Sequence, residues 1–163
     1  MAEANAQGQK SEQFDIQKIY LKDCSFEVPN APNIFIVQDQ QPSPKYEVAY
    51  ESKEIQAGMY EVVLNVTVTV MLGDQTAFLV EIKQAGVFTL SNMPKDKLAY
   101  MINGVCPNVL FPYARETVSE LITRGGFTPL YLPLMNFEGM YVQKLQQDGK
   151  LQVPENMQSP SAQ

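Results

Sequence analysis

The stretch Asn108–Ile122, NVLFPYARETVSELI, has the spacing of an amphipathic helix. We expect Asn108 to be its N-cap and Pro112 to lie in its first turn, where a missing amide donor costs little. Polar residues fill the side opposite the apolar stripe. The stripe recurs at steps of three and four positions and consists of Phe111, Ala114, Val118, Leu121 and Ile122.

The two ends of this helix differ in sequence. Gly125 and Gly126 favour a stop after the last apolar position. At the beginning, apolar residues surround more than one side, because Val109 and Tyr113 lie outside the stripe. One partner surface would not cover them, so we expect the helix to contact more than a single sheet.

The residues before this helix have the alternation of strands. Segment 59–72 alternates most clearly, with Val62, Leu64, Val66, Val68 and Val70 on one face and Asn65, Thr67 and Thr69 on the other. Gly73 and Asp74 predict a turn. Segment 75–90 then returns to complete a hairpin. Its inward residues are expected to be Phe78, Val80, Ile82 and Phe88.

Weaker signals complete the predicted fold. Segment 14–28 reads as a long strand with an irregularity, and segment 46–55 reads as a weaker strand. A short helix is expected over 136–148, with Asn136 as its cap. Strands followed by helices indicate an α+β fold, an antiparallel sheet covered on one face by the later helices.

Two connections are unusually apolar, and both chain ends are polar. Segments 29–45 and 125–136 carry aromatic and aliphatic residues between prolines, which is not typical of solvated loops. Such residues either cover the core or line a groove. Residues 1–12 and 149–163 have the composition of disordered tails. We therefore expect one domain over 13–148.

Length, charge and hydropathy exclude several classes of protein. A chain of 163 residues can bury the core of one domain. The net charge of -6 disfavours binding to nucleic acid and to anionic membranes. No apolar run is long enough to span a bilayer, and the N-terminus lacks the pattern of a signal peptide. We expect a cytoplasmic protein without membrane insertion.

The chemistry available to the chain is limited. It contains no histidine, and Cys24 and Cys106 are too few for a zinc site or a disulfide framework. Cys106 has no basic neighbour in sequence to activate it, so we expect an inert, packed thiol. No phosphate-binding glycine motif occurs. We therefore expect no metal, no cofactor and no catalytic residue.

Five blocks of the sequence carry a resemblance to a known family. They are NAPNIF, YEVVLNVTVTV, TAFLVEIKQAGVF, CPNVLFPYARETVSELITRGGF and LPLMNFEGMYVQKLQQ. Together they resemble SecB, the bacterial family of protein-export chaperones. The resemblance runs from about Phe14 to Gln147 and leaves only the tails unmatched.

The resemblance implies a fold, an assembly and a function. It implies a four-stranded antiparallel sheet with a long and a short C-terminal helix on one face, assembled as a dimer of dimers. SecB proteins have no catalytic activity. They bind unfolded precursor proteins in the cytoplasm without ATP, keep them competent for translocation and deliver them to SecA, the translocation ATPase.

The resemblance also implies three sets of site residues. A groove for precursors is expected at Ile34, Phe35, Ile36, Tyr46, Phe137, Met140, Tyr141 and Leu145. A surface for SecA is expected at Asp23, Glu27, Leu79 and Glu81, and strand parity places these four on one face of the sheet. The tetramer interface is expected at Phe111, Val118, Leu121 and Ile122.

Two other functions remain open at this point. An apolar groove with tyrosines as polar groups could bind a small molecule or serve an enzyme with an α+β fold. A purely structural subunit of an assembly would also have a two-sided apolar helix. Each expected groove residue could instead be part of the core, and the acidic positions could be an ordinary solvated strand face.

Overall fold

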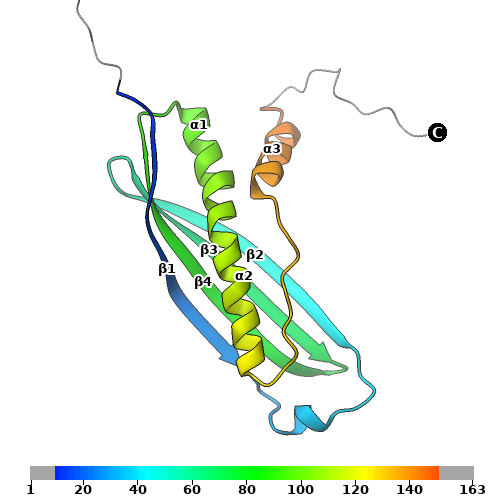
Figure 1. Ribbon diagram of the computed structural model, residues 1–163. Coiled ribbons are helices and arrows are strands. Elements are labelled where there is room, and N and C mark those ends of the chain that lie inside the picture. Colours follow the sequence, from blue (N-terminus) through cyan, green and yellow to red (C-terminus); the bar gives the residue numbers. More distant parts are fainter. Residues whose placement is uncertain (1–9, 151–163) are drawn as a thin grey trace, which may run out of the picture.

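The computed structural model describes residues 10–150, which fold as a four-stranded sheet with helices on one face (Figure 1). All neighbouring strands are antiparallel, and the order is β1-β4-β3-β2, so β1 and β2 are the edges. The α+β prediction is confirmed. The predicted tails, 1–12 and 149–163, lie almost entirely outside the described residues. The strands are β1 (Gln13–Glu27), β2 (Pro42–Gln56), β3 (Met59–Leu72) and β4 (Gln75–Ser91).

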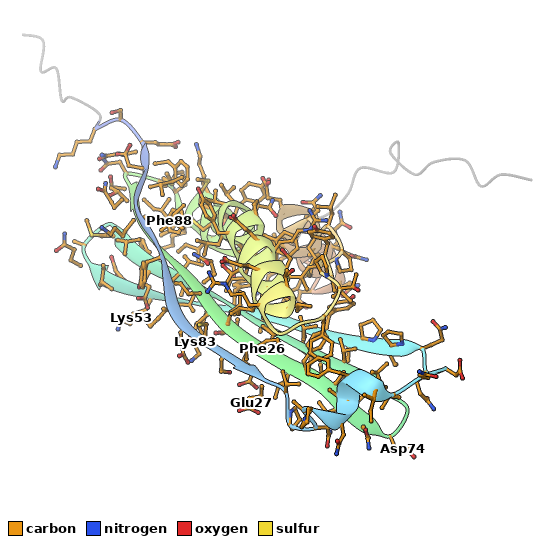
Figure 2. The ribbon with its side chains drawn as sticks, turned by 60° about the horizontal axis from the view of Figure 1, so that its bottom comes forward. Phe26, Glu27, Lys53, Asp74, Lys83 and Phe88 are labelled. Carbon is orange, nitrogen blue, oxygen red and sulfur yellow. The ribbon has the colours of Figure 1, made fainter. Side chains whose placement is uncertain are left out.

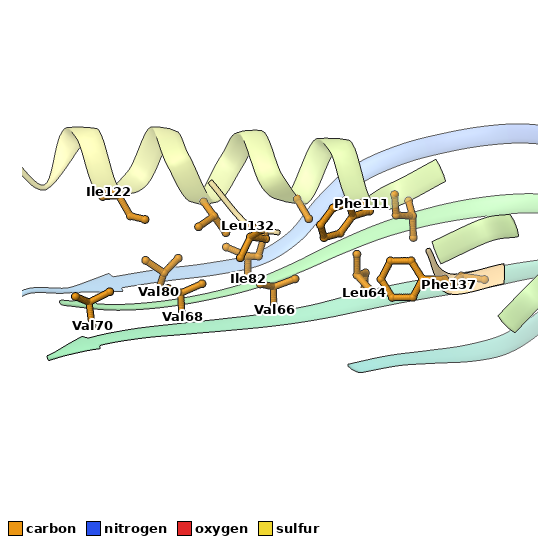
Figure 3. Close-up of a cluster of buried hydrophobic side chains, with 14 of the residues drawn as sticks. Leu64, Val66, Val68, Val70, Val80, Ile82, Phe111, Ile122, Leu132 and Phe137 are labelled. Atoms are coloured by element: carbon orange, nitrogen blue, oxygen red, sulfur yellow. The ribbon is translucent and has the colours of Figure 1, made fainter. Parts of the chain in front are cut away.

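The central hairpin follows the alternation of the sequence. Val62, Val66 and Val70 of β3 are buried on the face toward the helices, as predicted, and residues of β4 with the same parity join them. The turn uses Gly73 with a φ of 59°, a conformation that costs glycine least. Burial of this valine-rich face provides most of the core under the helices (Figure 3).

The edge strands contain the irregular features. Strand β1 has two register shifts against β4, which confirms the predicted irregularity. Strand β2 begins at Pro42, earlier than predicted, and includes Pro44 as well. Proline has no N–H to donate, so it is tolerated here because β2 lies at an edge of the sheet.

The long helix begins much earlier than the sequence suggested. Helix α1 (Lys95–Tyr100), the π-helical turn η2 (Met101–Val105) and α2 (Cys106–Arg124) form one rod across the sheet (Figure 1). Asn108 is therefore inside the helix, and its prediction as N-cap is wrong, as is the place of Pro112 in a first turn. An Asn with a Pro four residues later imitates a helix start. The extra residue of the π turn breaks the apolar period before Cys106.

Helix α2 packs on β3 and β4. Its buried residues include Leu110, Ala114 and Val118, which belong to the same core cluster as the valines of the sheet. Phe111 and Ile122 of α2 lie over those valines (Figure 3). Cys106 is fully buried, and this burial raises the pKa of its thiol to about 12. This burial confirms the prediction of a packed thiol, and the raised pKa disfavours the reactive thiolate. The helix ends before Gly125, as predicted.

The chain after α2 returns beside the long helix to α3 (Phe137–Gln147). Residues 125–136, called the connecting segment below, have no helix or strand and run from one end of the molecule toward the other (Figure 1). The short 3-10 helix η1 (Asn33–Ile36) lies at the end opposite α3. The side chain of Asn136 accepts a hydrogen bond of 3.0 Å from the Gly139 amide, so the predicted cap is confirmed.

Candidate functional site

Two hollows lie along the connecting segment. The first, of about 320 Å³, separates the segment from the sheet and is lined mainly by apolar groups of Pro42, Val70, Leu72, Ala77, Phe78, Phe127, Thr128, Pro129 and Leu130. The second, of about 300 Å³, separates it from α2 and is lined by Phe111, Pro112, Arg115, Glu116, Ser119, Tyr131 and Leu134. Both are open hollows with a mixed but mostly apolar lining, a surface that can accept extended peptide side chains.

The end of the segment near η1 is held by aromatic packing. The ring of Phe127 lies 4.8 Å from that of Phe78 and 5.2 Å from that of Phe35, measured between centroids. Phe35 is 50% exposed and Ile36 is 77% exposed, whereas Ile34 is buried in the core. This end therefore presents apolar surface to solvent next to the first hollow.

The end of the segment near α3 is held by hydrogen bonds as well as by one buried ring. Phe137 is buried against Phe111, and its amide donates a bond of 2.9 Å to Oδ1 of Asn108. Nδ2 of Asn108 donates to Oε2 of Glu138 at 2.7 Å, and the hydroxyl of Tyr100 donates to Oε1 of the same carboxylate. We call Tyr100, Asn108 and Glu138 the α3 bracket.

Close backbone packing supports the α3 bracket. A Cβ at Gly104, in the π turn, would lie 2.9 Å from Cα of Glu138, so only glycine fits there without a shift. The hydrogen bond from Tyr100 to the Glu138 carboxylate is the main cause that raises the pKa of the Tyr100 phenol above its ordinary value. The π turn and α3 therefore form one contact.

The predicted groove residues fall into two groups. Ile34, Phe35 and Ile36 lie at the η1 end, whereas Phe137, Met140, Tyr141 and Leu145 lie at the α3 end (Figure 1). The two apolar connections do meet, at Phe35 and Phe127, but the α3 residues are separated from that contact by the length of the connecting segment. Ile34 and Phe137 are core residues, and Tyr46 is half-buried on β2.

The predicted acidic positions share the face of the sheet that lies away from α2. Glu27 on β1 is paired with Leu79 on β4, and Glu81 is paired with Ser25. Figure 2 shows Glu27 and Lys83 on the side of the sheet opposite the helices. Asp23 is paired with Lys83 on the same face. Leu79 is half-buried and the three carboxylates are exposed. The structure thus brings these four residues together, as strand parity predicted.

A second charged cluster lies on the same face. Glu61 accepts a bond of 2.7 Å from Nζ of Lys22 and another from the hydroxyl of Tyr20, and these bonds lower the pKa of its carboxyl. Burial, together with Glu61, raises the pKa of Tyr20 to about 12. Tyr20 and Glu61 thereby join β1 to β3 across β4.

Comparison with known proteins identifies the family. The family model of SecB, described as preprotein translocase subunit SecB, matches residues 7–148. The protein-export protein SecB of Methylococcus capsulatus is 45% identical over 146 residues, which cover 90% of this chain and 92% of that relative. The corresponding protein of Nitrosococcus oceani is 49% identical over 147 residues, with coverage of 89% and 88%. The chain belongs to the SecB family.

A solved structure agrees with the fold. The Mycobacterium tuberculosis Rv1957 SecB-like chaperone, in complex with a ChAD peptide from the Rv1956 HigA1 antitoxin, has a TM-score of 0.62 at 20% identity. The match covers 75% of this chain and 90% of that one. The role of the present SecB-family chain is that of a chaperone in protein export. None of its helices within residues 10–150 is long and apolar enough to cross a membrane.

Some residues that line the two hollows were not among the predicted groove residues. Phe127, Tyr131 and Leu134 line the hollows, and the last two are 60% and 83% exposed. The apolar composition of segment 125–136 indicated that the segment is unusual. It did not indicate which of its residues face solvent. Arg115 was also missed, because its partner is a backbone carbonyl, that of Leu132.

The predicted tetramer interface lies on the long helix of this SecB-family chain. Phe111, Val118 and Ile122 are buried against the chain's own sheet and have little surface left for a neighbouring copy. Leu121 is half-buried and retains some surface that a neighbouring copy could contact. Tyr113, outside the predicted stripe, is exposed. The exposed apolar surface of the long helix is therefore at Tyr113 and, in part, at Leu121, and the other three predicted interface residues contribute little to it.

Proposed function

We propose that this chain captures unfolded precursor proteins along the connecting segment and keeps them competent for translocation. The observation that carries the proposal is the pair of apolar hollows beside exposed Tyr131 and Leu134. Unfolded chains present apolar and aromatic side chains that such hollows can accept, and binding only the unfolded state opposes folding by mass action. The peptide complex of the M. tuberculosis SecB-like chaperone supports a peptide as the ligand.

Capture in this proposal needs no chemical step. Apolar contact alone stabilises the complex, so neither a nucleotide nor a cofactor takes part and the protein is not an enzyme. Its place of action is the cytoplasm, where precursors are synthesised. Several weak contacts along the segment together give useful affinity for clients of different sequence.

The acidic positions on the outer face serve a different partner in this proposal. Asp23, Glu27 and Glu81 surround Leu79 and would receive a basic segment of SecA. Exposed charges steer association and are screened by salt, so the affinity falls as ionic strength rises. Calorimetric titration of the wild type and Glu81→Lys with SecA tests this: equal affinities contradict it.

Assembly into a homotetramer, a dimer of dimers, is the third part of the proposal. Phe14, Ile16 and Leu21 of β1 leave apolar surface exposed, and Tyr113 does so on α2. A second copy that covered these residues would remove an exposed apolar patch from water. Light scattering at micromolar concentration measures this, and a monomeric mass contradicts it.

The capture proposal is tested with a protein that cannot refold. We expect the wild type to bind reduced, carboxymethylated α-lactalbumin, and the double variant Tyr131→Ser, Leu134→Ser to bind about tenfold more weakly, since two exposed apolar contacts are lost. Ile55→Ser is the control, because Ile55 is also exposed but lies at the tip of the β2–β3 hairpin. Equal binding by the double variant and the control would place capture elsewhere.

A further inference from the structure

The connecting segment is a long piece of chain without regular structure. Its backbone groups have no helix or sheet to pair with, so its position depends on a few contacts. Phe127 packs in the aromatic cluster at one end, and Phe137 is fixed by the α3 bracket at the other. Between these ends only Leu132 is buried, and it is almost completely so.

Arg115 of α2 contacts this middle point directly. Its Nε donates a hydrogen bond of 2.9 Å to the carbonyl oxygen of Leu132, and its Cζ lies 5.3 Å from the centroid of the Tyr131 ring. The ion pairs found among residues 10–150 do not include Arg115. Its guanidinium therefore contacts the connecting segment and does not pair with a carboxylate of these residues.

The position of Arg115 connects both hollows. Its side chain lines the hollow between α2 and the segment. The segment it holds also forms a wall of the other hollow, through Phe127 and Leu130. A shift of the segment at Leu132 would therefore change the width of both hollows at once.

We propose that Arg115 is a positioning residue for client capture, one that fixes the middle of the connecting segment and so sets the shape of both hollows. This inference rests on the proposed function, since it assumes that clients bind beside the segment. The planar guanidinium meets two needs at once: an N–H aimed at a carbonyl and a flat cation over an aromatic ring. A lysine ammonium provides the charge without this fixed geometry.

The test compares two Arg→Lys changes on the same helix. Arg115→Lys removes the contact with the segment, whereas Arg124→Lys affects an exposed pair with Glu120 four residues away and serves as the control. Hydrogen exchange of peptides covering residues 127–136 reports the position of the segment. Binding of reduced, carboxymethylated α-lactalbumin reports capture, and melting temperature with light scattering reports fold and assembly.

For Arg115→Lys we expect faster hydrogen exchange confined to residues 127–136. We also expect client affinity to be about tenfold weaker, mainly through faster dissociation, because one charge-assisted hydrogen bond is lost. Arg115→Ala should lose as much client affinity as Arg115→Lys, because the positive charge that lysine retains does not hold the segment by itself. Melting temperature and mass should equal those of Arg124→Lys. Wild-type exchange or wild-type affinity in Arg115→Lys overturns the inference, and so does a loss of affinity matched by a general loss of stability.

The same measurements separate this inference from the function on which it rests. If the wild type itself fails to bind the unfolded probe, the proposed capture function is wrong. If the wild type binds and Arg115→Lys binds equally well, capture stands and the positioning role of Arg115 is wrong.

Discussion

The two ends of the connecting segment are fixed by different physical means. At the η1 end, Phe127 packs between Phe78 and the half-exposed ring of Phe35. At the α3 end, a buried Phe137 is combined with the α3 bracket, in which donors and acceptors are matched one to one. Aromatic packing has little directional preference beyond ring geometry, whereas hydrogen bonds specify both partner and orientation.

This difference suggests that the two ends of the connecting segment respond differently to a bound client. Rings held only by packing can change their rotamers to suit different side chains, which suits a surface for clients of many sequences. A bracketed helix keeps one position until its hydrogen bonds break. We therefore expect the η1 end to adapt to a client residue by residue, and α3 to respond as a unit.

The largest effect should come from replacing equivalent rings at the two ends. Phe137→Ala removes a fully buried ring that meets Tyr50 and Phe111, and should lower the free energy of unfolding by about 3–5 kcal/mol. Phe35→Ala, at a half-exposed ring, should cost about 1 kcal/mol. Urea unfolding measures both. Equal losses would show that the two ends are held alike.

An intermediate effect should come from the α3 bracket. Asn108→Ala leaves the Phe137 amide without its acceptor and removes a donor to Glu138, and should cost about 1–3 kcal/mol. The loss should be local: faster hydrogen exchange in α3 and unchanged exchange around η1. Asn103→Ala is the control, because Asn103 lies on the same rod and bonds only to the Ala99 carbonyl. Unchanged exchange of α3 in Asn108→Ala would mean that the α3 bracket does not hold the helix.

The smallest effect should appear on titration with base. The folded protein raises the pKa of Tyr100 above its ordinary value of 10.0, mainly through the bond to Glu138, so it favours the protonated phenol. That contribution to stability is complete below pH 10 and is lost as the pH rises through the raised pKa. Exchange of α3 should therefore accelerate more above pH 10 in the wild type than in Tyr100→Phe, after correction for intrinsic rates. Identical pH profiles would exclude Tyr100 from this role.

The sheet could be predicted from the sequence because its signal is local. The alternating valines of β3 place one continuous apolar row toward the helices, and Gly73 marks the turn. The start of the long helix could not be predicted in the same way. Asn108 is a residue type that often caps helices, but its side chain forms hydrogen bonds with Phe137 and Glu138 of α3, far along the chain.

The candidate site was predicted in composition but not in arrangement. The apolar connections were identified, yet exposure depends on where the connecting segment lies, which is decided by packing of Leu132 and Phe137. Arg115 contacts a carbonyl group, and every residue type has one, so no pattern of side chains could reveal the pair. The acidic face was easier to predict from the sequence, since the alternation of side chains on adjacent strands is enough to place Glu27 and Leu79 on the same face.

The π turn Met101–Val105 makes the two halves of the long helix depend on one extra residue. Deleting a residue from it would convert the turn to ordinary α-helix and rotate everything on one side by about 100° relative to the other. Tyr100 would then point away from Glu138 while Asn108 kept its place. The number of residues in this one turn is therefore a structural requirement of its own: a deletion there would separate α1 from α3 while Tyr100 and Glu138, which join them, are both still present.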